Sequence, residues 1–171
     1  MVDTPFTDSY IESDAELEAL IGTADPRAAA IALKALAAAS QEWYCQEATR
    51  RIDALPLRGT KYDIDVVAGV PDQPRAFPRI IDGVTCDWNS STSLAFVPAD
   101  VKRACVEEAI ALYQYQDSPD MAYQEMGIKQ LQLGTGAGFS VTYSGSLTAI
   151  SIMSTRAKQI MRRYMGGVAV R

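Results

Sequence analysis

The stretch from Pro98 to about Gln116 constrains the fold of this chain more than any other part of the sequence. Its apolar residues fall into two adjoining rows with three- and four-residue steps, the spacing of one broad helical face. One row holds Val101, Cys105, Ala109 and Leu112, and the other holds Val106, Ile110 and Tyr113. Two adjoining apolar rows leave little helix surface for water. We therefore expect this helix at the centre of a helical bundle.

Two short helices are indicated by their caps. The first runs from about Ser13 to Ile21, with Glu16 completing a capping box and Gly22 ending the helix. The second is a terminal helix that begins after Ser154. Its apolar face is predicted to consist of Ala157, Ile160, Met161 and Tyr164, with Gly166-Gly167 at its end.

A longer helix is predicted from Pro26 to about Leu55. Asp25-Pro26 is a typical helix start, and the alanine-rich sequence that follows favours helix formation. One apolar stripe extends from Leu33 through Tyr44 to Leu55, so we expect a single continuous helix.

Two regions between the helices lack the helical pattern. Residues 57–97 contain scattered prolines and are predicted to form a long irregular loop with short strands at Asp63–Val67 and Leu94–Val97. Residues 127–146 alternate apolar and polar side chains on both sides of a glycine-rich turn, which indicates a β-hairpin or arm. An isolated hairpin is marginally stable, so we expect it to pack on the bundle or on another subunit.

These patterns predict a mainly α fold: a small helical bundle with a long irregular loop, a β-hairpin or arm and a C-terminal helix. We expect a bundle domain over residues 1–146, with the inserted loop 57–97 and the hairpin 127–146, followed by a C-terminal docking arm or helix over residues 147–171. No apolar run approaches the ~20 residues that cross a bilayer, and the acidic N-terminus does not resemble a secretory signal. We therefore expect a soluble protein.

Enzyme chemistry is disfavoured by the residues that the sequence lacks. There is no histidine, which removes the usual general base and the commonest transition-metal ligand. The three cysteines, Cys45, Cys86 and Cys105, are widely spaced. Cys45 and Cys105 lie on apolar helix rows, which is typical of buried thiols without a catalytic role. The cluster Gly134–Gly138 has neither the lysine nor the following helix of a phosphate loop. We expect no catalytic residue, no cofactor and no metal site.

Charge is distributed unevenly along the chain. The net charge is −5, yet residues 147–171 carry five basic side chains and no acidic one, whereas the first 26 residues carry acidic groups alone. A basic tail on an acidic body suggests that the tail meets an acidic partner. A solvated basic helix end, favoured by the helix dipole, explains the pattern equally well.

The order of several motifs resembles the head–tail connector, or adaptor, proteins of tailed phages. Some profiles of this family carry the label DnaT-like single-stranded-DNA-binding. The resembling segments are Tyr10–Leu17, Ala48–Asp53, Arg58-Gly59, Gln73–Arg79, Val97–Ala109, Gly138–Tyr143 and Met161–Gly167. The chain departs from the family in having Phe77-Pro78-Arg79 where Trp-Pro-Arg is frequent, and residues 60–72 look like an insertion.

This resemblance implies a structural subunit of the virion, made in the host cytoplasm. Such a subunit forms a ring, typically of about twelve copies, beneath the portal protein. DNA passes through the lumen without sequence-specific binding, and a downstream stopper or tail-completion protein docks on the far side. An acidic lumen would let DNA slide, since it repels phosphates.

The basic tail is the segment that we expect to contact the portal. The predicted docking residues are Arg156, Lys158, Met161, Arg162, Arg163, Tyr164 and Arg171. The alternative function is a single-stranded-DNA-binding module, in which exposed aromatic side chains would stack on bases. The acidic body and the lack of a clustered basic groove make that alternative the weaker one.

Overall fold

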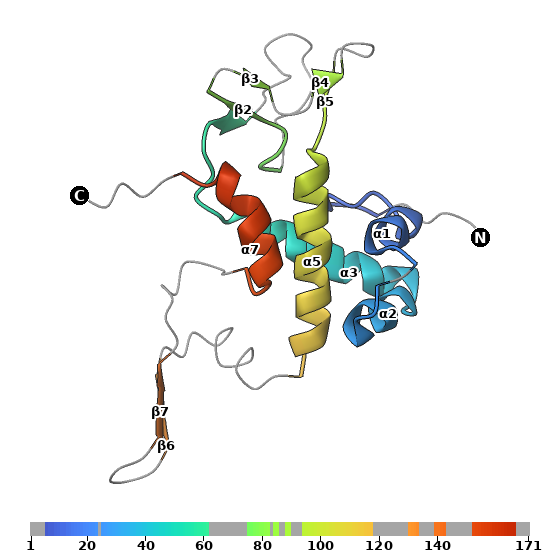
Figure 1. Cartoon of the computed structure of the whole chain (residues 1–171), viewed down its shortest axis with the longest axis vertical. Coiled ribbons are helices and arrows are strands. Elements are labelled where there is room, and N and C mark those ends of the chain that lie inside the picture. Colours follow the sequence, from blue (N-terminus) through green and yellow to red (C-terminus); the bar gives the residue numbers. More distant parts are fainter. Residues whose placement is uncertain are drawn as a thin grey trace.

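Helix α5 (Ala99–Tyr115) lies at the centre of the fold (Figure 1). The computed structural model describes residues 6–23, 25–61, 75–82, 84–85, 88–89, 94–117, 130–133, 139–142 and 152–166. All four residues of the first predicted row and two of the second, Val106 and Ile110, are buried, and Tyr113 is partly buried. Helices α3 (Ala38–Asp53), α7 (Thr155–Met161) and α2 (Ala28–Lys34) pack against α5. The prediction of a central buried helix is confirmed.

The N-cap and the terminal glycine predicted for the first helix are confirmed, whereas the predicted capping box forms only in part. Helix α1 spans Asp14–Ile21, and the Ser13 hydroxyl accepts a hydrogen bond from the Glu16 N–H at 3.3 Å. The Glu16 carboxylate accepts from the backbone N–H of Glu12 at 2.7 Å, one residue before the position of a standard capping box. Gly22 ends the helix with φ +80°, a conformation that favours glycine.

The prediction of one continuous helix from Pro26 to Leu55 is wrong. The chain turns after Lys34 and begins α3 at Ala38, so α2 and α3 contact α5 separately. The Gln41 side-chain amide donates to the Leu33 and Lys34 carbonyls at 3.3 and 3.0 Å. These bonds give the Lys34 carbonyl at the end of α2 a donor, and they add a second donor to the Leu33 carbonyl, which also accepts from the Leu36 N–H.

The loop 57–97 contains small sheets where the structure describes it. Strands β1 (Thr60–Lys61), β2 (Arg79–Ile81) and β3 (Val84–Thr85) form an antiparallel sheet, and β4 (Trp88–Asn89) pairs with β5 (Leu94–Ala95). The predicted strand at Leu94–Val97 is thus shorter than expected, and the one at Asp63–Val67 lies outside the described residues. Gly59 has φ +71°, and a Cβ there would lie 2.0 Å from the Ile80 carbonyl oxygen. This approach requires glycine.

The Phe77-Pro78-Arg79 motif joins the loop to the bundle. The Phe77 ring is buried between Tyr10 and Tyr164, with ring centroids 6.1 and 5.1 Å away in edge-to-face geometry. The Arg79 guanidinium donates to four backbone carbonyls, at distances from 2.6 to 3.4 Å. The motif therefore has a structural role in holding the loop.

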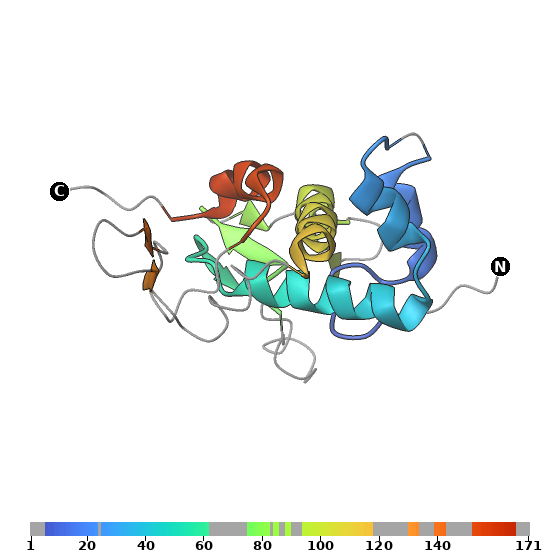
Figure 2. The ribbon, with the colours of Figure 1, turned by 90° about the horizontal axis from the view of Figure 1, so that it is seen from below.

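The predicted hairpin is confirmed in its described part, where β6 (Gln130–Leu133) pairs antiparallel with β7 (Phe139–Thr142). A one-turn 3₁₀ helix, η1 (Arg162–Tyr164), continues α7. The predicted mainly α class is therefore also confirmed. Seen along α5, α7 lies on one side of that helix and α1 and α2 lie on the other (Figure 2). Among the described residues, no helix combines the length and apolarity needed to cross a membrane.

Candidate functional site: an arginine-rich groove between α5 and α7

The start of α7 is fixed by a buried carboxylate of α5. Glu108 has no exposed surface, and its two carboxylate oxygens accept hydrogen bonds from the Met153 and Ser154 N–H groups at 2.8 to 2.9 Å. Burial raises the pKa of Glu108. The Ser154 hydroxyl in turn accepts a hydrogen bond from the Ala157 N–H at 3.2 Å, so the prediction of Ser154 as the N-cap is confirmed.

One face of α7 and η1 belongs to the core of the bundle. Ala157, Met161 and Tyr164 are buried, and Met161 has no exposed surface at all. The helix therefore shares its core with α5, and the predicted docking arm or helix over residues 147–171 stays a prediction. Two of the predicted docking residues, Met161 and Tyr164, are therefore buried in the core, and the docking set stays a prediction.

The other face of α7 borders a groove of about 550 Å³ against α5. The groove is lined by Asp100, Arg103, Glu107, Arg156, Gln159, Ile160, Arg162 and Arg163. Four arginines against two carboxylates leave a formal surplus of two positive charges. The groove contains three of the predicted docking residues, Arg156, Arg162 and Arg163.

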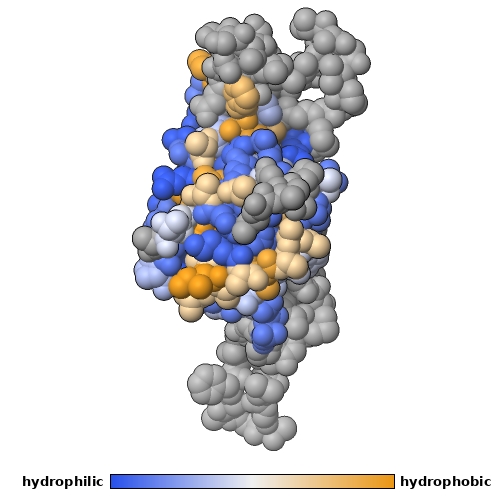
Figure 3. All heavy atoms as spheres, turned by 90° about the vertical axis from the view of Figure 1, so that its right-hand side faces the viewer, coloured by the Kyte–Doolittle hydropathy of each residue, from blue (hydrophilic) through white to orange (hydrophobic). Residues whose placement is uncertain are grey.

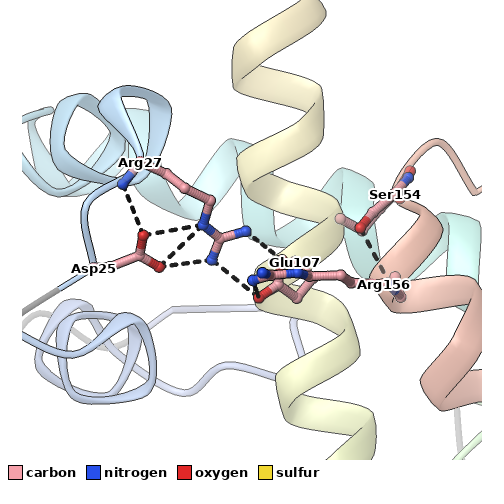
Figure 4. Close-up of polar contacts among 7 residues, drawn as sticks. Asp25, Arg27, Glu107, Ser154 and Arg156 are labelled. Atoms are coloured by element: carbon pink, nitrogen blue, oxygen red, sulfur yellow. Dashed lines mark hydrogen bonds and ion pairs between the residues drawn. The ribbon is translucent and has the colours of Figure 1, made fainter.

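Carboxylates hold some of these arginines in place (Figure 4). Glu107 pairs with Arg27 and lies 3.6 Å from Arg156, and Asp25 also pairs with Arg27, at 2.6 Å. Hydrogen bonds from Arg27 lower the pKa of Asp25 to about 2. Glu107 therefore lies between Arg27, in the segment before α2, and Arg156 on the groove side of α7.

A further ion pair spans the groove from α5 to η1. Asp100 lies 2.5 Å from Arg163, and the Arg163 guanidinium also stacks on the Tyr164 ring at 4.6 Å. Within the described part of the chain, Arg103, Lys158 and Arg162 have no ion-pair or hydrogen-bond partner for their side chains, and all three are exposed. These three cations are available to a ligand or a partner.

The structure places the predicted docking residues in three different ways. Arg156, Lys158, Arg162 and Arg163 are exposed on α7 and η1, Met161 and Tyr164 are in the core, and Arg171 lies outside the described residues. Sequence reasoning missed Asp100, Arg103 and Glu107. Their spacing of three and four residues puts them on one face of the predicted helix 98–116, and this signal could have revealed them.

The chemistry of the groove suits binding through charge-assisted hydrogen bonds. Arginine presents a planar set of donors that matches carboxylates and phosphates. Among the described residues, no cluster of His, Cys, Asp or Glu has the arrangement of a metal site. Burial raises the pKa values of Cys45 and Cys105, the latter to about 12, so these thiols remain protonated at neutral pH.

Comparison of the chain with protein-family models, with curated proteins and with solved structures finds no match.

Proposed function

We propose that this chain is a non-enzymatic adaptor subunit of a phage head–tail connector, located in the virion at the head–tail interface. In this role, copies of the chain form a ring beneath the portal protein, DNA passes through the ring, and the next connector or tail protein docks on its far side. The ordered sequence resemblance suggests this role. The observation that carries it at the structural level is the arginine-rich groove on a helix whose opposite face is locked into the core.

The groove supports a role in protein docking because its arginines are held on rigid elements. Both walls are helices, and Asp100 and Glu107 form ion pairs with two of the arginines. A preformed surface loses little conformational entropy on binding. We therefore propose the exposed cations Arg156, Lys158, Arg162 and Arg163, together with Arg103, as the portal-docking surface.

Charge reversal in the groove tests this proposal. The double variant Arg103→Glu/Arg162→Glu changes two exposed arginines without breaking an internal ion pair among the described residues. We expect its affinity for the portal protein to fall about tenfold or more, with a fold as stable as that of the wild type. Affinity is measured by biolayer interferometry at two salt concentrations.

The control is Arg50→Glu/Lys61→Glu, which makes the same change in net charge at two exposed cations on α3 and β1 and also removes the exposed Arg50–Glu47 ion pair. It should bind the portal like the wild type. Equal binding by the groove variant and the wild type would contradict the assignment of this surface. Negative-stain images of the wild type mixed with portal should show rings, and images without rings would contradict the proposed function as a whole.

Single-stranded-DNA binding is less well supported by the arrangement of the aromatic side chains. Trp43 is on α3 and Phe77 is buried, and among the residues that the structure describes no aromatic side chain lines the arginine-rich groove. A strand following the arginines would therefore lack a stacking platform there. Fluorescence anisotropy with a labelled oligonucleotide at low salt should give a flat titration, and salt-sensitive binding would favour this alternative.

A further inference from the structure

Two ion pairs between α5 and the α7–η1 segment mark the ends of the arginine-rich groove. Asp100 lies 2.5 Å from Arg163 at one end, and Glu107 lies 3.6 Å from Arg156 at the other. On both elements the paired residues are seven positions apart, which corresponds to about two helical turns or roughly 10 Å. The two walls of the groove therefore run antiparallel and in register.

Arg103 occupies the middle of α5 within this groove. It is three residues after Asp100 and four before Glu107, so it lies on the same face of the helix. Gln159 and Ile160 hold the equivalent middle positions on α7, and neither side chain carries a charge. Among the residues that the structure describes, the Arg103 side chain has no hydrogen bond or ion pair. The groove thus contains an unpaired guanidinium between two closed ion pairs.

The surplus charge of the groove belongs to two arginines. The ion pairs at both ends are neutral as a whole, because the one that involves Glu107 also includes Arg27 and Asp25 (Figure 4). The two remaining positive charges are those of Arg103 and Arg162, and both of these side chains are exposed. Charge complementarity therefore favours an occupant that brings about two negative charges.

The lining of the groove favours a peptide over a nucleic acid. One strand of a DNA duplex carries about one charge per 3.4 Å, so about three phosphates would lie along the groove and meet the carboxylates of Asp100 and Glu107. Two carboxylates on a peptide match the surplus and can lie between those two acids. The half-buried Ile160 adds an apolar contact that a peptide side chain can cover and a phosphate cannot.

We propose that the arginine-rich groove binds an acidic peptide segment of its partner, with one carboxylate on Arg103 and a second on Arg162. This inference rests on the proposed function, in which the groove is the docking surface, and it names the chemistry that this surface recognises. Arg103 determines specificity, since its planar guanidinium forms two parallel N–H···O bonds with a carboxylate.

The register of the walls also predicts the spacing of the two acidic residues. Arg162 comes one residue before the arginine that pairs with Asp100, and Asp100 is about one helical turn from Arg103. Side chains three or four residues apart on a helix are about one turn apart. We therefore expect the two acidic residues of the partner to be three or four positions apart on a helical segment.

The surface on the other side of α5 has a different character. Figure 3 views the side on which α1 and α2 lie, and it shows strongly apolar atoms at the lower edge of the coloured body. The acidic helix α1 belongs to this side, and α5 separates it from the groove (Figure 2). Helix α1 therefore does not fill the groove of its own copy.

NMR titration of the 15N-labelled full chain with a short acidic peptide tests the proposal. The probe is an alanine-rich peptide, capped at both ends, with two glutamates four positions apart, and the control peptide has glutamine at both positions. Exposed ion pairs are individually weak, so we expect a dissociation constant in the millimolar range, which rises with salt. The glutamate peptide should shift the signals of Arg103, Gln159 and Ile160, and the glutamine peptide should leave them unchanged.

A conservative substitution separates carboxylate recognition from general attraction of charge. Arg103→Lys keeps the positive charge and removes the planar set of donors, so we expect the peptide affinity to fall about fivefold or more. The matched control is Arg50→Lys, the same change at an exposed arginine of α3 outside the groove lining. Its peptide affinity should stay within about twofold of the wild-type value, and the NMR spectra should show the fold retained in both variants.

The remaining outcomes distinguish this inference from the proposed function. Unshifted groove signals, or equal peptide affinity of Arg103→Lys and the wild type, would overturn the acidic-peptide assignment and leave portal docking standing. A single-stranded oligonucleotide that shifts the same signals at lower concentration than the peptide would overturn the assignment in favour of nucleic acid. Peptide binding as expected, without any binding of portal protein to the full chain, would overturn the proposed function and keep the groove as an acidic-peptide site.

Discussion

At the scale of single residues, Glu108 is the side chain on which the position of α7 depends most. It lies on α5, has no exposed surface, and accepts hydrogen bonds from two N–H groups at the start of the next described helix. Arg51 of α3 is 3.7 Å from its carboxylate. Burial of a carboxylate costs desolvation energy that these partners offset. Removal of the carboxylate or of one partner should therefore lower the free energy of unfolding.

Replacement of Glu108 by glutamine leaves one acceptor oxygen where there were two. The amide group that replaces the other oxygen, which accepts from the Met153 N–H and faces Arg51, is a donor beside two donors, and this unpaired buried group costs about 1–3 kcal/mol of unfolding free energy. Urea unfolding followed by circular dichroism measures the loss at pH 7. The control Asp117→Asn also replaces a carboxylate by an amide, but at an exposed position. Its free energy of unfolding should lie within about 0.5 kcal/mol of the wild-type value. An unchanged Glu108→Gln variant would show that the carboxylate is not the anchor.

The cost of Glu108→Gln should also depend on pH. Because burial raises the pKa of Glu108 in the folded state above its ordinary value of 4.5, the folded state binds more protons than the unfolded state in this window. The stability contributed by this group is therefore fully present below pH 4.5, and it is lost as pH rises through the folded pKa. Glutamine cannot titrate, so we expect the variant to lose more stability relative to wild type at pH 5 than at pH 7. A difference that is constant, or that grows with pH, would contradict this sign.

At the scale of elements, α7 divides into two faces with separate roles. The buried face holds Ala157 and Met161 in the core, and the exposed face carries the cations of the groove. A helix of only 7 residues is too short to be stable alone, so its caps and its packing must define it. The proposed docking surface is therefore only as well ordered as the start of this helix.

Ser154→Ala tests that dependence. The substitution removes the hydroxyl that accepts the Ala157 N–H, and loss of an N-cap costs about 0.5–2 kcal/mol. Thermal unfolding should shift downward, and portal affinity should fall as α7 frays. Thr155→Ala, which removes an exposed hydroxyl at the next position of the same helix, serves as the control and should leave both quantities unchanged. A cap variant as stable as the control would mean that Glu108 alone defines the helix start.

At the scale of the whole molecule, the C-terminal helix completes the core of the bundle. Ile152, Met161 and Tyr164 are all buried there, and each contributes about 1.5–3 kcal/mol through burial. The net stability of a domain is only about 5–15 kcal/mol, so these three side chains represent a large share of it.

A chain truncated after residue 151 should therefore lose its cooperative unfolding transition. Urea titration followed by circular dichroism and tryptophan fluorescence checks this expectation. A sigmoidal transition at a denaturant concentration close to that of the full chain would mean that the bundle is complete without α7. Because deletion of α7 should unfold the bundle, point changes in charge test portal docking better than deletion does.

Local signals in the sequence were sufficient for most of the helices. Ser13, Gly22 and Ser154 mark real helix boundaries because caps act through bonds to nearby backbone groups, and Pro98 stands at the N-cap position of α5 without a side-chain bond. The two rows of the 98–116 helix correctly indicated the centre of the bundle, since only a buried helix is apolar over so wide a face.

Tertiary contacts decided what those local signals could not. The alanine-rich run has high helix propensity throughout, so the break before Ala38 is visible only once Gln41 caps α2 and both helices reach α5. Likewise, the basic tail looked like one docking segment, but packing put Met161 and Tyr164 in the core and left the arginines outside. The sequence by itself determined the class of fold and the charge of its C-terminal helix. Only the tertiary structure decided which side chains meet across the groove, because Asp100, Arg103 and Glu107 are far from α7 along the chain and reach it only through packing.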